Sequence, residues 1–142
     1  MKLPKIFYHY FEETKIEDIL NKYDFIFVFT FASYCNYCKE FDLKLSEYLS
    51  DWNLMTDYKI VVLYVLADDI DVTLLNNMLF EKESDYISVD VFDNKLYMND
   101  MNINQVPHLI LLKRGGYLLD RSPIETLKLY GVKSLEEWNK NK

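Results

Sequence analysis

The two cysteines of the chain, Cys35 and Cys38, are separated by only two residues. Two thiols at this spacing can close into a disulfide when they lie at a turn, and a thiolate can attack the disulfide of another molecule. The pattern therefore indicates thiol–disulfide exchange. We assign the attack to an exposed Cys35 and the resolution of the mixed disulfide to a more buried Cys38.

A strand and a helix are expected to position these thiols. Phe25 to Phe31 is aromatic and β-branched, apolar at almost every position and too short for a buried helix, which is typical of a central strand covered on both faces. From Lys39 to Leu49, apolar residues recur at helical spacing, so Cys35 should lie at or just before the first helical turn. Unpaired N–H groups and the positive end of the helix dipole favour a thiolate there.

Three other interpretations of the cysteines compete with redox chemistry. Zinc prefers four ligands, and the chain offers no further cysteine and only His9 and His108, which are far apart in the sequence. A structural disulfide would close a loop too small to contribute much stability. A redox scaffold whose cysteines no longer react stays open. We expect no metal and no cofactor.

The residues around the thiols resemble the thioredoxin-family signature. Phe31 to Lys39 (FASYCNYCK) follows its order of aromatic, Ala, any residue, aromatic and Cys-x-x-Cys-Lys, and Asn102 to Gly116 is similar to the family segment in which a cis-proline precedes a strand and a hairpin. The resemblance implies that Pro107 is cis and packs against the disulfide. It also implies that the Val106 backbone pairs with an extended substrate segment.

The resemblance further implies a substrate groove beside the dithiol, framed by Tyr34, Asn36, Tyr37, Val106 and Pro107. The residues between the cysteines tune the redox poise, and Asn36 can donate a side-chain hydrogen bond toward the Cys35 sulfur. Tyr37 is also typical of glutaredoxins, so glutathione-dependent activity is an alternative. The elements before the central strand and the long interval to the proline argue against it.

Two positions depart from the family pattern. Many thioredoxins carry a buried carboxylate six residues before the first cysteine, where this chain has Phe29. A lysine on the neighbouring strand often accompanies it, where this chain has Tyr64. The deprotonation of Cys38 would then rely on water, on Glu40 or on the attacking geometry.

Two further groups of polar residues invite a chemical role. His108 follows Pro107 and could stabilise a thiolate or make it pH-dependent, although a solvated or backbone-bonded histidine is the more common arrangement at the start of a strand. The aspartates of the segment 68–71 lack the glycine and distal glutamate of a calcium loop. We interpret them as a strand-to-helix turn with an N-cap aspartate.

Composition bounds the class of protein and its partners. Residues 1–142 suffice for one domain with a large core, and half of them are apolar. The net charge of −7 argues against nucleic acid or an anionic membrane as a partner. No run approaches the length of a transmembrane helix, and Met1 to Phe7 lacks the apolar core of a signal peptide. We therefore expect a cytoplasmic monomer.

Periodicity and capping signals predict the elements of the first half. An edge strand over Lys5 to Phe11 is followed by a helix that begins with a capping box at Thr14 and Glu17 and buries Ile16, Ile19 and Leu20. Ser50 to Asp57 is predicted to form a polar turn, in which Trp52 and Leu54 pack at the margin of the core. A buried strand is predicted over Lys59 to Ala67.

The second half is predicted in the same way. It holds a hairpin of Leu109 to Lys113 and Tyr117 to Asp120, a turn of helix within Ser122 to Gly131, and a last helix that begins with a capping box at Ser134 and Glu137 and buries Leu135 and Trp138. The middle segment is longer than in a minimal thioredoxin and is similar to that of tryparedoxins. Its insertion, roughly residues 70–100, is expected to hold a helix over Asp71 to Glu83, an alternating or looped segment over Tyr86 to Phe92 and a short helix over Lys95 to Met101.

These observations predict an α/β protein of thioredoxin-like fold, with a mixed central β-sheet flanked by helices. The predicted activity is that of a protein dithiol–disulfide oxidoreductase, with protein disulfides as substrates and a separate thiol reductase as electron donor. The alternative is a binding or adaptor module that keeps the fold but has little redox turnover.

Overall fold

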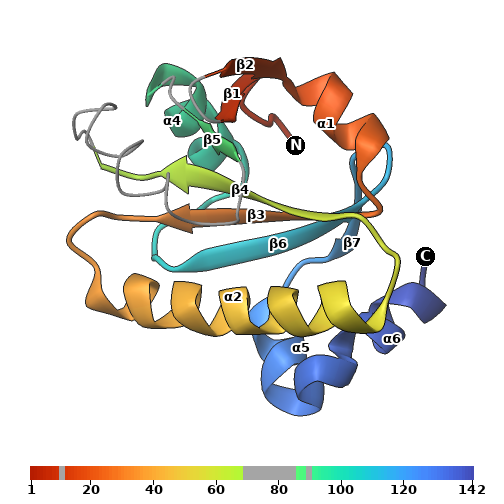
Figure 1. The fold of residues 1–142 in the computed structure, drawn as a ribbon. Helices are drawn as coiled ribbons and strands as arrows, with labels where there is room; N and C mark the ends of the chain where they lie inside the picture. Colours follow the sequence, from red (N-terminus) through yellow and green to blue (C-terminus); the bar gives the residue numbers. More distant parts are fainter. Residues whose placement is uncertain (10–11, 69–85, 89–90) are drawn as a thin grey trace.

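The computed structural model describes residues 1–9, 12–68, 86–88 and 91–142. The described strands form one mixed sheet between two layers of helices (Figure 1). In the order β2-β1-β5-β4-β3-β6-β7 the sheet holds β1 (Ile6–His9), β2 (Glu12–Lys15), β3 (Phe25–Phe31), β4 (Ile60–Leu66), β5 (Tyr86–Ser88), β6 (His108–Lys113) and β7 (Tyr117–Asp120). The predicted fold class is confirmed.

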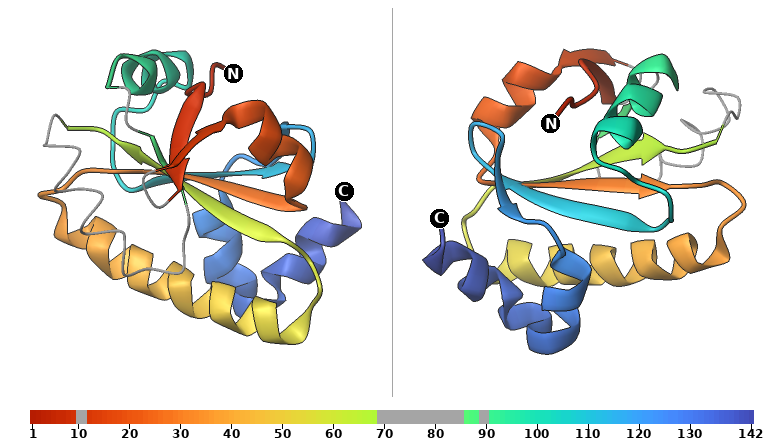
Figure 2. Two further views of the ribbon diagram at one scale, coloured as in Figure 1. Left: turned by 45° about the horizontal axis from the view of Figure 1, so that its top comes forward. Right: turned by 180° about the vertical axis from the view of Figure 1, so that it is seen from behind.

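Helices cover both faces of this sheet. They are α1 (Ile16–Lys22), α2 (Asn36–Met55), α4 (Val91–Asp100), α5 (Pro123–Tyr130) and α6 (Ser134–Lys140), with a short 3₁₀ helix η1 (Gly131–Lys133) between the last two. The long α2 runs along one face together with α5 and α6, while α1 and α4 lie against the other face (Figures 1 and 2).

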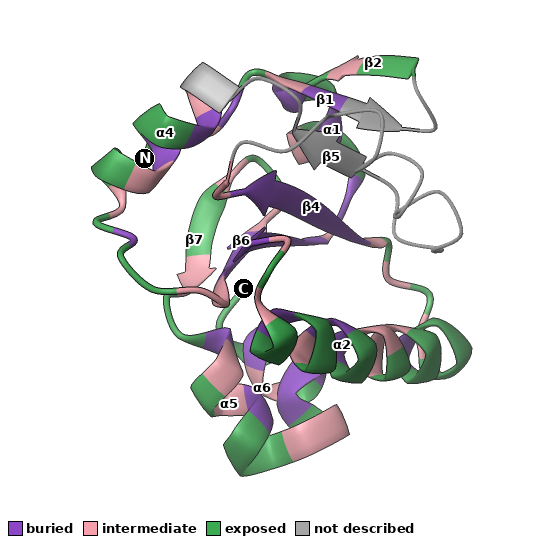
Figure 3. Ribbon diagram, turned by 90° about the vertical axis from the view of Figure 1, so that its left-hand side faces the viewer, coloured by how far each residue is buried: buried purple, intermediate pink, exposed green. Residues whose placement is uncertain are grey.

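The central strand β3 is buried along its whole length, as its apolar run predicted. It pairs in parallel with β4 on one side and antiparallel with β6 on the other. Burial is concentrated at these strands and at the inner sides of the helices (Figure 3). The end of β3 therefore delivers the chain to the start of α2 from a rigid position.

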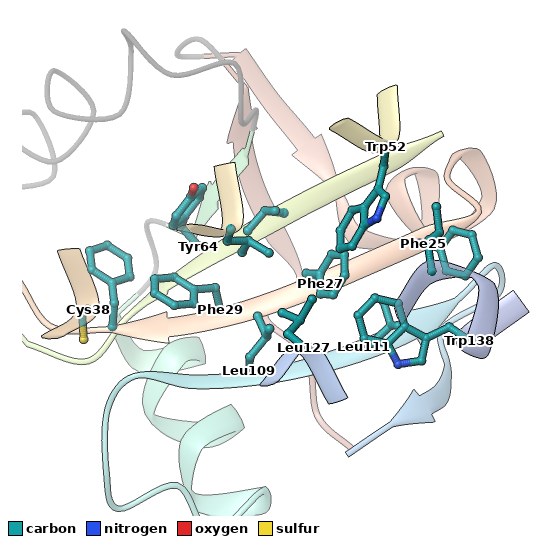
Figure 4. Close-up of a cluster of buried hydrophobic side chains, with 14 of the residues drawn as sticks. Phe25, Phe27, Phe29, Cys38, Trp52, Tyr64, Leu109, Leu111, Leu127 and Trp138 are labelled. Atoms are coloured by element: carbon teal, nitrogen blue, oxygen red, sulfur yellow. The ribbon is translucent and has the colours of Figure 1, made fainter. Parts of the chain in front are cut away.

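Side-chain alternation along β3 divides the core into two clusters. Phe25, Phe27, Phe29 and Phe31 face α2, α5 and α6, and they pack with Trp52, Trp138 and Leu127 (Figure 4). Ile26 and Val28 face the other layer, which holds Ile19 and Tyr97. Each face of the strand thus anchors one layer of helices.

The helix α2 is longer than the sequence predicted. The turn expected over Ser50 to Asp57 is wrong, because helical structure continues to Met55 and ends at Thr56, whose backbone N–H donates to the Trp52 carbonyl. Trp52 is a fully buried core residue that stacks on Phe27, whereas Leu54 is exposed. The packing of Trp52 outweighs the polar residues around it.

The N-terminal segment differs from its prediction in two respects. The capping box at Thr14 and Glu17 does not form, because Thr14 belongs to β2 and pairs with Phe7, and α1 follows directly with Lys15 as N-cap and no side-chain cap bond. Since β2 lies outside β1, the strand predicted over Lys5 to Phe11 is not at the edge of the sheet. The predicted apolar stripe of α1 is confirmed, with Ile16 and Ile19 buried.

In the C-terminal half the predicted strands and helices form, but the predicted capping box does not. The hairpin of β6 and β7 is confirmed, and Gly115 and Gly116 at its turn have φ of 90° and 88°, which glycine adopts without strain. The segment after it forms the full helix α5. The capping box at Ser134 does not form, because the chain enters α6 from η1 and the Ser134 hydroxyl donates to the Thr126 carbonyl instead.

The middle segment lies partly outside the described residues. The helix predicted over Asp71 to Glu83 falls outside them entirely. Within the segment predicted as alternating or looped, residues 86–88 form the strand β5, and Val91 already begins α4, which therefore starts earlier than the predicted Lys95. Among the described helices, none has the length and apolar character needed to cross a membrane.

Replacement of the buried Trp52 tests the extended α2 and its packing. Trp52→Ala removes the stack on Phe27 and the hydrogen bond from its Nε1 to the Val132 carbonyl. We expect the free energy of unfolding to fall by about 3–5 kcal/mol. Urea denaturation measures it, with Leu54→Ala on the same helix as a control that changes it by less than about 0.5 kcal/mol. Similar small effects for both variants would contradict the assigned packing.

Candidate active site

Both thiols lie at the start of α2. Cys35 is the N-cap residue, and its Sγ accepts a hydrogen bond of 3.1 Å from the Cys38 backbone N–H. Cys35 is partly exposed and Cys38 is buried, and neither is in a disulfide. The predicted placement is confirmed: one sulfur is accessible at the end of a helix, and the other is covered one turn further along.

The buried thiol is held in its protonated form. Burial raises the pKa of Cys38 to about 12, and the hydrogen bond with the side chain of Cys35 adds to the shift. At neutral pH Cys38 is therefore a thiol that must lose its proton before it can act as a nucleophile.

The loop that leads into the dithiol is fixed by an aspartate on the neighbouring strand end. The Ser33 backbone N–H donates to Asp68 Oδ1 at 2.9 Å, and the Ser33 hydroxyl donates to the other oxygen of the same carboxylate. The Cys35 N–H donates to the Ala32 carbonyl at 3.2 Å, which closes the turn. Asp68 thus holds the approach to Cys35, a role that the sequence analysis missed because it requires a contact between strand ends.

The proline segment adjoins the same end of β3. The Val106–Pro107 peptide is cis. Thr30 pairs with His108 across the two antiparallel strands, so Pro107 lies beside the end of β3 that leads to Cys35. Val106 packs against the core cluster that contains Cys38. The structure therefore brings Val106 and Pro107 to the dithiol end of the sheet.

His108 belongs to the other face. Leu109 and Leu111 face α2, so alternation places His108 with Ile110 toward α1 and α4. Burial lowers the pKa of His108, and its Nδ1 finds no hydrogen-bond partner among the described residues. In this register the imidazole lies on the sheet face opposite to the core cluster against which Cys35 packs and to which Cys38 belongs.

The residues around the cysteines are open to solvent. Tyr34 is 76% exposed and Tyr37 is 63% exposed, and Asn36 is exposed between the two thiols. The hydrogen bond that the structure gives to the Cys35 sulfur comes from the Cys38 backbone rather than from the Asn36 side chain. Two large uncovered tyrosines beside the partly exposed Cys35 sulfur are suited to contact another molecule.

A buried carboxylate lies beneath the site at an unexpected position. Phe29 and Tyr64 are cross-strand neighbours, as the departures from the family pattern suggested. The Tyr64 hydroxyl donates to Asp42 Oδ1 at 2.8 Å, and Asp42 is buried one turn after Cys38 on α2. Sequence reasoning missed Asp42, although an acidic residue four positions after Cys38 and three before Leu45 falls on the buried face of the helix.

The described residues hold no group of three or more histidine, cysteine, aspartate or glutamate side chains arranged to bind a metal ion. Glu40, one of the groups considered for proton transfer, is exposed on α2.

Comparison with known proteins identifies the fold. Neither a family model nor a curated protein sequence matches the chain. Among solved structures, tryparedoxin from Trypanosoma brucei is 12% identical with a TM-score of 0.76, covering 97% of this chain and 94% of that one. Thioredoxin from Wuchereria bancrofti is 19% identical with a TM-score of 0.71, covering 100% and 99%. Tryparedoxin II complexed with glutathionylspermidine is 10% identical with a TM-score of 0.70, covering 88% and 85%. The chain has the thioredoxin fold.

The raised pKa of Cys38 predicts a distinct pH dependence of its alkylation. In the reduced protein, the iodoacetamide reaction of Cys38 should be slow at pH 7 and should accelerate without levelling off up to pH 10, because the thiolate fraction grows tenfold per pH unit below the pKa. Site-resolved mass spectrometry measures it.

The Cys35→Ser variant is the control for this measurement. Because burial is the first cause of the shift, the acceleration should persist in that variant. A plateau in the Cys38 rate near pH 8 would contradict the assignment.

Proposed function

We propose that the protein is a thiol–disulfide oxidoreductase that acts on protein disulfides. The main support for the proposal is the asymmetry of the dithiol. Cys35 is partly exposed at the N-cap of α2, and Cys38 is buried three residues further along. The Cys38 backbone N–H donates to the Cys35 sulfur at 3.1 Å. Exchange chemistry needs one accessible sulfur to attack and one protected sulfur to resolve.

In the first step, the Cys35 thiolate attacks one sulfur of the substrate disulfide. The substrate S–S bond breaks, a mixed disulfide forms between Cys35 and the substrate, and the second substrate sulfur leaves as a thiolate. The Cys38 N–H, which donates to the Cys35 sulfur, would stabilise the negative charge of this thiolate.

In the second step, Cys38 loses its proton and attacks the Cys35 sulfur of the mixed disulfide. The bond to the substrate breaks, and the Cys35–Cys38 disulfide forms, so that two electrons have passed to the substrate. The thiolate released in the first step is a base beside the site that can accept the Cys38 proton. A separate thiol reductase would then restore the dithiol.

The substrate segment would lie across the exposed end of the sheet. Tyr34, Asn36 and Tyr37 would frame it on the cysteine side, and the Val106 backbone and Pro107 would face it on the other. The open surroundings of Cys35 favour a protein substrate over a ligand that must be enclosed. One structural neighbour binds glutathionylspermidine, so a small thiol conjugate is the second substrate class to test.

Replacement of Cys38 by serine tests the order of the two steps. Cys38→Ser keeps the attacking thiol and removes the resolving one, so mixed disulfides with substrate proteins should accumulate. Non-reducing electrophoresis and mass spectrometry after exposure to oxidised cell extract measure the covalent adducts, which should carry the substrate on Cys35.

Two matched variants complete this experiment. The double variant Cys35→Ser, Cys38→Ser should capture no covalent partner. The Cys35→Ser variant distinguishes an enzyme from an adaptor, because an enzyme loses turnover whereas an adaptor retains its partner. Absence of any adduct with Cys38→Ser would contradict the proposed mechanism.

A further inference from the structure

A hollow between α2 and α5 begins at the residue before Cys38. Tyr37, between the two cysteines, lines one end of it, and Phe41 and Tyr48 continue the lining along α2. Ile124 and Leu127 close it from α5. These α2 residues recur at spacings of four and seven positions, which puts them on one side of the helix. We call this hollow the α2–α5 groove.

The floor of the α2–α5 groove is fixed by the core. Phe41 stacks on Phe29 of β3 with ring centroids 5.5 Å apart, and Tyr48 stacks on Trp52 at 5.7 Å. Leu127 is only 5% exposed and belongs to the same core cluster. The groove is therefore preformed, and a side chain that enters it meets a rigid apolar surface.

Two lysines stand at the rim of the groove of a chain that is acidic as a whole. Lys44 and Lys128 line the groove together with the carboxylate of Glu40, and the chain has a net charge of −7. Lys128 pairs with Glu125 at 3.7 Å, but both side chains are well exposed, and an exposed ion pair of this kind contributes little. Both lysines are therefore accessible to an acidic partner.

The volume of the groove decides what kind of occupant it fits. It encloses about 170 Å³, below the roughly 300–1,000 Å³ typical of small-molecule and cofactor sites. It suits one large side chain of a protein partner. Its position sets the spacing: Phe41 lies six residues after Cys35, about 9 Å along the helix, which is about three residues of extended chain.

We propose that the α2–α5 groove binds a segment of the substrate protein about three residues from its reactive cysteine. The segment inserts an aromatic or large aliphatic side chain between Phe41 and Leu127, and an adjacent carboxylate faces Lys44 and Lys128. This assignment rests on the proposed oxidoreductase function and names the sequence feature that would select substrates for it.

The test uses symmetric peptide disulfide dimers, in which each chain carries a variable pair of residues beginning three positions from its cysteine. The pairs are Phe-Asp, Phe-Lys and Ala-Asp, with the dipeptide placed before the cysteine in one series and after it in another. The protein is reduced and freed of reductant. Each turnover oxidises its dithiol to the Cys35–Cys38 disulfide and yields two peptide thiols, so the second-order rate constant comes from alkylation and mass analysis.

With the wild-type protein, in at least one series, the Phe-Asp dimer should react at least fivefold faster than either the Phe-Lys or the Ala-Asp dimer. The net charge of −7 would by itself favour the lysine peptide, so a preference for aspartate must come from local charge. In the variant Lys44→Glu, Lys128→Glu, the preference between Phe-Asp and Phe-Lys should reverse.

A matched charge variant separates the groove from the general field of the protein. Lys59→Glu, Lys140→Glu takes the net charge from −7 to −11, as does the groove variant, since each substitution changes the charge by −2. Lys140 pairs with Glu137, three positions away, at 3.1 Å, and Lys128 pairs with Glu125, also three positions away, at 3.7 Å. This variant should keep the wild-type preference for Phe-Asp.

Two outcomes would overturn the groove assignment alone. One is that the three dimers oxidise the wild-type protein at equal rates in both series. The other is that the preference for Phe-Asp persists in Lys44→Glu, Lys128→Glu. If no dimer oxidises the wild-type protein, the proposed function itself fails, and the groove assignment fails with it.

Discussion

The packing of α2 against β3 determines where the two thiols lie. Phe29 stacks on Phe41 and Phe27 stacks on Trp52, so the helix is held to the strand at two points about three turns apart. With the helix fixed in this way, Cys35 comes to its N-cap and Cys38 to its buried face. The difference in exposure between the two sulfurs is therefore a consequence of core packing, and the proposed chemistry depends on it.

Polar contacts beneath the dithiol come from positions that the family resemblance does not indicate. Phe29 and Tyr64 stand where the family pattern has a carboxylate and a lysine, so the layer under the site is more apolar than that pattern. The carboxylate that accepts the hydrogen bond from the Tyr64 hydroxyl belongs to Asp42 of α2. A second carboxylate, that of Asp68, holds Ser33 and with it the loop before Cys35. One acidic group thus supports the helix side of the site, and the other supports its loop.

Local patterns predicted the elements that carry strong apolar runs, and long-range contacts decided the rest. The strands β3 and β4, the β6–β7 hairpin and the N-cap position of Cys35 follow from runs of residues and their punctuation. The two predicted capping boxes do not form. Thr14 pairs with Phe7 in the sheet, and α6 follows directly on the 3₁₀ helix η1. The roles of Asp42 and Asp68 depend on partners 22 and 35 residues away, which no local pattern reveals.

The redox titration of the Cys35/Cys38 pair tests the central claim most directly. The protein would be equilibrated in a series of dithiol buffers, alkylated, and analysed by the mass shift of each cysteine. The account predicts one two-electron transition to an intramolecular disulfide, with a midpoint in the range of about −270 to −120 mV spanned by dithiol oxidoreductases. If the two thiols remain reduced, or form only intermolecular disulfides, at every poise, the claim that this dithiol performs exchange chemistry is contradicted.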